Sequence, residues 1–214
     1  MKKPVLMLIV GLLVGGLVSY LVVEARVKAA VGEIHATISM QEAELTSLLD
    51  LTYNNRTDEV VAKIVKGCTN DEQTRFDALL DALTGLSLAE LNEAEELLTK
   101  CGDYTALKKV VMVTRLEREL QIYQDQIALL KTIAPTTAPE DYHLETWQQL
   151  VALEKQRSES LQTFVLLQGE VIQGLKDGFT TESETIQDVT AKVIAERESY
   201  TVLRAEIDRL RESL

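Results

Sequence analysis

The chain is poor in the residues that usually build catalytic sites. It contains two histidines and two cysteines among 214 residues, with no glycine-rich phosphate loop, no Gly-x-Ser-x-Gly elbow and no Cys-x-x-Cys pair. Glu140 and His143 have the Glu-x-x-His spacing of di-iron bundles, but such a site needs a second pair and two further carboxylates. The sequence therefore predicts a protein that is not an enzyme and that holds no metal and no cofactor.

Basic and aromatic residues are also scarce. Lysine and arginine number 22 against 34 acidic residues, which gives a net charge of -12, and aromatic residues make up 5%. Because phosphate binding needs a basic surface, a nucleic-acid partner is excluded. Leu, Glu, Ala, Lys and Arg dominate the composition, which favours long helices packed by aliphatic side chains over a mixed sheet. We therefore predict an all-α fold.

Charge is absent from residues 4–23, "PVLMLIVGLLVGGLVSYLVV". Twenty helical residues span about 30 Å, the thickness of the hydrocarbon core of a bilayer. The alternative is a cleaved signal peptide, and Val23 and Ala25 do have the small-residue spacing of a cleavage site. The apolar run is longer than the roughly 7–15 residues of a signal-peptide core, which favours an uncleaved transmembrane anchor.

The expected orientation places residues 1–3 in the cytoplasm as a short tail. Lys2 and Lys3 precede the span and Arg26 and Lys28 follow it, so the positive-inside count is close to a tie. A long domain translocates largely regardless of its charge. We therefore expect a single-pass protein, in contact with the lipid bilayer, with its bulk in the periplasm or the extracellular space.

Small residues recur within the predicted anchor at four-residue spacing. They are Gly11, Gly15 and Ser19. Such a stripe lets a second membrane helix approach closely, although glycine is common in membrane helices in any case.

Residues 24–66 are predicted to form a stalk helix and a short helix. Apolar residues continue beyond the anchor in heptad steps, and we call this set the stalk seam: Val27, Val31, Ile34, Ile38, Leu45 and Leu48. The seam can pack on the rest of its own chain as a fourth helix, or on another protein chain in a homo-oligomer or a membrane complex. "NNRTDE" interrupts the stalk, and Thr57 is the expected N-cap of the short helix, which ends near Lys66.

Residues 67–102 are predicted to form a helical hairpin. Thr69 and Glu72 have capping-box spacing, as do Ser87 and Glu90, and Gly102 is the expected stop of the second helix.

The two cysteines, Cys68 and Cys101, lie at the two ends of this hairpin. Antiparallel helices of similar length bring these ends together, which favours a disulfide over two unrelated free thiols. Zinc needs four ligands, and no histidine or further cysteine is near in sequence. A disulfide indicates an oxidising compartment, which agrees with the expected orientation.

Residues 103–214 are predicted to form an antiparallel, coiled-coil-like three-helix bundle. Three heptad segments are separated by "APTTAPEDY" and "KDGFTTESE", with Gly178 as a helix stop and Thr181 with Glu184 as a capping box. Near the middle the heptad positions become polar, and we expect a polar core layer of Glu154, Ser158, Glu196, Tyr123 and Tyr200. Such layers usually fix helix register, and the alternative is a ligand cavity between the helices.

These patterns predict a membrane-anchored extracytoplasmic protein that acts as a structural or interaction subunit, a scaffold or adaptor, of a membrane-associated assembly. The alternative is an extracytoplasmic sensor or ligand-binding bundle. With three residues before the expected span, such a sensor would have to signal through a partner.

Overall fold

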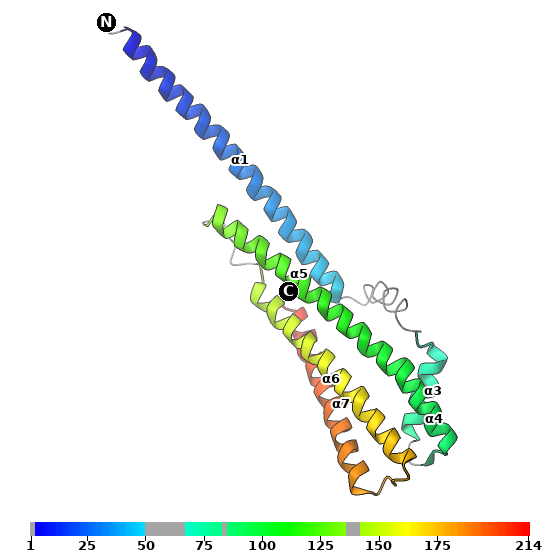
Figure 1. Cartoon of the computed structure of the whole chain (residues 1–214). Helices are drawn as coiled ribbons and strands as arrows, with labels where there is room; N and C mark the ends of the chain where they lie inside the picture. Colours follow the sequence, from blue (N-terminus) through cyan, green and yellow to red (C-terminus); the bar gives the residue numbers. More distant parts are fainter. Residues whose placement is uncertain (1–2, 50–66, 83–84, 136–141) are drawn as a thin grey trace. The chain divides into compact units, whose positions relative to one another are not determined.

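The computed structural model describes residues 3–49, 67–82, 85–135 and 142–214, with side chains from residue 19 onward in the first range. Every regular element in these ranges is helical, so the predicted all-α class is confirmed (Figure 1). The elements are α1 (Lys3–Leu49), α3 (Asn70–Asp81), α4 (Leu88–Leu97), the π-helical turn η2 (Leu98–Gly102), α5 (Asp103–Ile133), α6 (Leu144–Lys176) and α7 (Glu184–Arg211).

The chain divides into two compact units. The first unit contains residues 1–44 and 121–142, and the second contains residues 45–120 and 143–214. Two helices therefore contribute to both units, because α1 ends and α5 begins in the second one.

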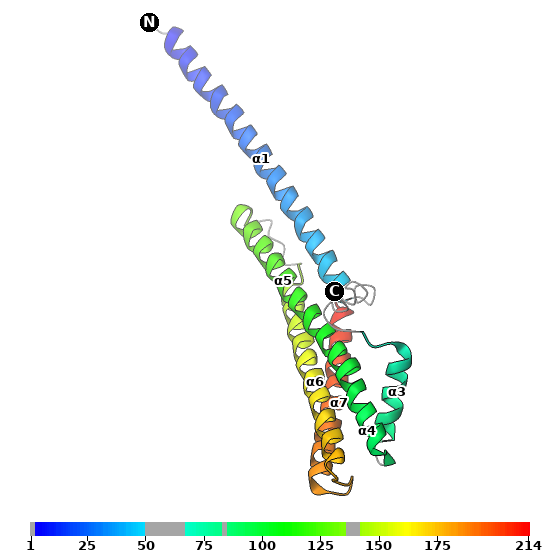
Figure 2. The same ribbon diagram turned by 45° about the vertical axis from the view of Figure 1, so that its right-hand side comes forward.

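In the first unit, α1 and the last part of α5 run side by side in both views (Figures 1 and 2). The burial of the stalk seam increases along α1. Val27 is 42% exposed, Val31 and Ile34 are partly buried, and Ile38 is completely buried. Leu45 and Leu48, which belong to the second unit, are also completely buried. The seam is therefore covered within its own chain from Ile38 onward.

The predicted anchor spans residues 4–23, and the structure describes the side chains of residues 19–23 of this span. Gly11 and Gly15 lie outside the residues whose side chains are described. Ser19 is described and exposed. No helix within the described residues combines the length and apolar character needed to cross a lipid bilayer. The predicted short helix between Thr57 and Lys66 lies outside the described residues.

In the second unit, the hairpin of α3 and α4 begins each helix with the predicted capping box. Glu72 N–H donates to Thr69 Oγ1 at 3.3 Å, and Thr69 N–H donates to Glu72 Oε2 at 2.9 Å. Ser87 and Glu90 exchange the equivalent bonds at 2.9 and 3.4 Å. Helices this short are marginal alone, so satisfying the free N–H groups of the first turn helps to define where each begins.

The predicted helix stop at Gly102 is wrong. The chain continues from α4 through η2 into α5, and Gly102 is buried within the π-helical turn. A Cβ atom at this position would lie 3.1 Å from both Leu98 Cδ1 and Val165 Cγ1. The glycine therefore permits a close approach of this turn to α6, and it does not end a helix.

Two predictions concern the α6–α7 connection: the helix stop at Gly178 is confirmed, and the capping box that begins the next helix is wrong. Gly178 ends α6 with φ 90°, and Phe179 N–H donates to the Gly174 carbonyl at 3.1 Å, as in a Schellman motif. The predicted capping box of Thr181 and Glu184 does not form. Ser183 is the N-cap of α7, and its hydroxyl donates to the Thr180 carbonyl at 2.7 Å. The loop closes on itself, and α7 returns antiparallel to α6 (Figure 2).

Candidate functional site

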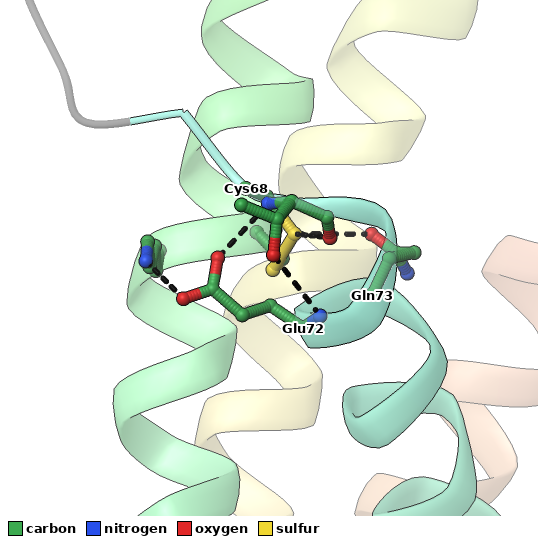
Figure 3. A network of polar contacts seen from close by, with 6 residues as sticks. Cys68, Glu72 and Gln73 are labelled. Atoms are coloured by element: carbon green, nitrogen blue, oxygen red, sulfur yellow. Dashed lines mark hydrogen bonds and ion pairs between the residues drawn. A yellow bond between two sulfur atoms is a disulfide. The ribbon is translucent and has the colours of Figure 1, made fainter.

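The hairpin is closed by the predicted disulfide between Cys68 and Cys101. The sulfurs are bonded and the Cα atoms are 4.9 Å apart, so the bridge joins the start of α3 to η2. Figure 3 shows the bridge next to the first turn of α3, with Glu72 directed back toward Cys68. The apolar side of the hairpin, including Phe76 and Leu98, packs with Val165 of α6.

One carboxylate strengthens this closure. Glu72 accepts the N-cap hydrogen bond of α3 and also forms an ion pair with Lys100, the neighbour of Cys101 (Figure 3). The hydrogen bond from Lys100, followed by the backbone hydrogen bond from Thr69, lowers the pKa of Glu72 to about 2. The same side chain therefore caps α3 and joins it to η2, beside the covalent bridge.

Two of the predicted polar-layer residues, Glu154 and Tyr200, belong to a charged cluster in the second unit. Glu154 is 3% exposed and accepts ion pairs from Lys109 of α5 at 3.2 Å and from Arg157 at 2.9 Å. The Arg157 guanidinium lies over the Tyr200 ring of α7, 5.5 Å from its centroid. Burial lowers the pKa of Lys109, and the nearby positive charge of Arg157 adds to this shift while Glu154 opposes it.

Glu196 lies in a separate contact between α6 and α7. Ser160, which is buried, donates from its hydroxyl to Glu196 Oε2 at 2.7 Å. Ser158 is also buried, and its hydroxyl has no hydrogen-bond partner among the described residues. Tyr123 lies in the first unit, and the other four residues of the predicted layer lie in the second.

Sequence reasoning missed Lys109, Arg157 and Ser160. Arg157 lies three residues after Glu154, which is a readable helical pairing signal. Lys109 carries no such signal, because its contact depends on how α5 and α6 are rotated. The resulting cluster places two cations on one buried carboxylate. Its geometry fixes the register of three helices, and it contains no nucleophile paired with a base.

The first unit contains a polar contact that the sequence did not predict. The Tyr142 hydroxyl lies 2.6 Å from His35 Nδ1 of α1, and the Tyr123 hydroxyl donates to the Tyr142 carbonyl at 2.6 Å. Burial, and then the carboxylate of Glu42, raises the pKa of Tyr142. The hydroxyl therefore stays protonated at neutral pH, and a tyrosine hydroxyl can either donate to or accept from an imidazole nitrogen. This contact joins α1 to the last part of the α5–α6 connection.

The part of the chain that the structure describes contains no group of three or more His, Cys, Asp or Glu side chains placed to hold a metal ion. Glu140 of the Glu-x-x-His spacing lies outside that part, and His143 is the N-cap of α6.

The chain matches no protein-family model, no curated protein and no solved structure.

Proposed function

We propose that the protein is a membrane-anchored, extracytoplasmic interaction subunit that binds another protein chain through the uncovered part of α1. The observation that carries this proposal is the contrast along that helix. Its seam is buried within the chain from Ile38 onward, whereas Val27 is uncovered, as are Tyr20, Leu21, Val22 and Val23.

The uncovered residues have the composition of a membrane boundary. Four consecutive apolar residues point in all directions around a helix, so no single face of the chain could cover them. Tyrosine is enriched at the level of lipid headgroups, and Arg26 and Lys28 follow six and eight residues after Tyr20. The uncharged run over residues 4–23 supports the anchor, and alkaline extraction of membranes tests it: an anchored chain stays with the lipid, and a released chain would contradict the proposal.

The disulfide supports the proposed compartment. Stable disulfides are rare in reducing compartments, so a bridge that closes the hairpin supports a location outside the cytoplasm. Protein extracted with thiols blocked at once should show Cys68 and Cys101 unmodified. Two alkylated cysteines would contradict this part of the proposal.

Val27→Glu tests the interaction surface. It places a charge on an exposed position of the seam, so we expect the fold to persist while cross-linked oligomers or co-purifying chains disappear. Ala29→Glu is the matched control, because residue 29 is also exposed and lies about 200° around the helix from residue 27.

Affinity purification of the intact protein from membranes, with the co-purified chains identified, gives the readout. The proposal predicts partners with the wild type and Ala29→Glu, and their loss with Val27→Glu. Retention of the same partners by Val27→Glu would overturn the proposed surface.

A further inference from the structure

The second unit contains a cavity that the proposed function does not use. Its volume is about 630 Å³, and it lies between α3, α6 and α7 beside the π-helical turn. Small-molecule sites usually have volumes of about 300–1,000 Å³. On α6 its lining begins at Leu161, beyond the charged cluster of Glu154 and Arg157, so the cavity is separate from the predicted polar layer.

The three helices supply walls that are mainly apolar. Each contributes a pair of aliphatic or aromatic side chains: Phe76 and Leu80 from α3, Phe164 and Val165 from α6, and Val193 and Ile194 from α7. Because the disulfide and the Glu72–Lys100 ion pair join the start of α3 to η2, the α3 wall is held in place independently of any ligand.

One polar group is buried in this lining. Gln168 is 9% exposed, and its carboxamide makes no hydrogen bond within the described residues. The other polar lining residues are exposed, with Asp77 on α3 and Arg197 on α7 carrying opposite charges. A carboxamide both donates and accepts hydrogen bonds but carries no charge. The interior therefore suits a neutral hydrogen-bonding group, because the charged side chains are at the solvent-exposed rim.

We propose that this cavity binds a neutral small molecule with an apolar body and one hydrogen-bonding group that pairs with the Gln168 carboxamide. The carboxamide can pair with the polar group of such a ligand in place of water, while the apolar body of the ligand covers the walls. The proposal goes beyond the interaction function and does not depend on it, since every lining residue belongs to the second unit.

Indole is a suitable probe, because it is a neutral aromatic molecule with one N–H donor. We would titrate it into the oxidised full-length chain with ¹³C-labelled methyl groups and follow the spectrum by NMR. We expect saturable shifts at Ile194 and Val193, and no saturable shift at Val202, which lies on the same helix outside the cavity and is 68% exposed. Shifts that do not saturate, or that are equal at Val202, would overturn the proposal.

Two substitutions locate the binding site. Ile194→Trp fills the cavity from a position that is 53% exposed, so we expect indole affinity to fall by about tenfold or more. Val202→Trp, the matched control, should leave the affinity unchanged. Gln168→Leu removes the hydrogen-bonding group at similar size and should weaken binding about fivefold. Equal affinities in all three variants would contradict the assigned site, and circular dichroism would check that each variant is folded.

Discussion

The two compact units hold their helices together by different means. In the second unit, α3 and α4 have 12 and 10 residues, and a capping box begins each of them while a disulfide joins their ends. In the first unit, α1 has 47 residues in total and needs no such local device to persist. Forming the first turn of a helix is unfavourable in free energy, whereas each further residue adds a hydrogen bond. Short helices therefore need caps or cross-links for stability, and long helices gain it from their many internal hydrogen bonds.

The units also differ in the polar groups that they bury. The second unit encloses charge, with Glu154 between Lys109 and Arg157. In the first unit hydroxyl groups make the corresponding contacts: Tyr123 donates to the Tyr142 carbonyl, and the Tyr142 hydroxyl hydrogen-bonds to His35 Nδ1. Leaving a buried charge without its partner lowers the free energy of unfolding far more than leaving a buried hydroxyl unpaired. Single substitutions at these contacts should therefore destabilise the second unit more than the first.

The largest effect is expected from Glu154→Gln. This change leaves Lys109 and Arg157, which are largely buried, without a counter-charge, and we expect the free energy of unfolding to fall by about 3–5 kcal/mol. Urea denaturation followed by circular dichroism measures it. The triple replacement of Lys109, Glu154 and Arg157 by Met is the control and should recover most of the loss. A loss below about 1 kcal/mol for Glu154→Gln would show that the cluster is not buried as described.

The next effect is expected from replacing both Cys68 and Cys101 by Ser. The bridge spans a sequence separation of 33 residues, and its removal should lower the stability by about 3–4 kcal/mol in the chain-entropy description. Thermal unfolding of the variant, compared with the oxidised wild type, measures the change, and the wild type in the presence of a reductant should match the variant. The comparison between the units predicts that hydrogen exchange in the hairpin accelerates more than in the first unit. Uniform acceleration throughout the chain would contradict it.

A smaller effect is expected in the first unit from Tyr142→Phe. This change removes the hydroxyl that hydrogen-bonds to His35 Nδ1, and the expected loss is about 1 kcal/mol. Hydrogen exchange of α1 around residue 35 is the most direct measurement. Tyr20→Phe is the control, because Tyr20 is exposed and its hydroxyl should contribute little. Equal protection in both variants would show that the contact does not hold α1.

The smallest effect is expected from Glu72→Gln, and it shows as a change in how stability depends on pH. The pKa of Glu72 is about 2 in the folded protein, below its ordinary value of 4.5, so the unfolded chain binds more protons between these values. This carboxylate therefore contributes stability above pH 4.5 that is lost as the pH falls toward 2. We expect melting temperatures recorded from about pH 5 to about pH 2 to decline less in Glu72→Gln than in the wild type. Parallel curves would contradict the role assigned to Glu72.

Several features of the hairpin and of the end of α6 could be predicted from the sequence, because they depend on residues a few positions apart in the chain. The capping boxes at Thr69 and Ser87 are formed by side chains three positions apart, and the left-handed turn at Gly178 suits glycine. The disulfide was also predictable, because the antiparallel helices of a short hairpin bring the two cysteines at its ends close together. Local rules still failed at Thr181, where the chain makes its turn and begins α7 at Glu184 through Ser183 instead.

The sequence by itself thus determined that this protein is helical, where its short helices begin and that its two cysteines pair. The tertiary structure alone decided that Gly102 faces Val165 and does not end a helix, that Lys109 reaches Glu154, and that a cavity opens beside Gln168. The physical reason is that two antiparallel helices can slide past each other by whole heptads and still place apolar positions opposite apolar positions. They specify that helices pack, but the rotation and register that bring two particular side chains together depend on the packing of the whole core.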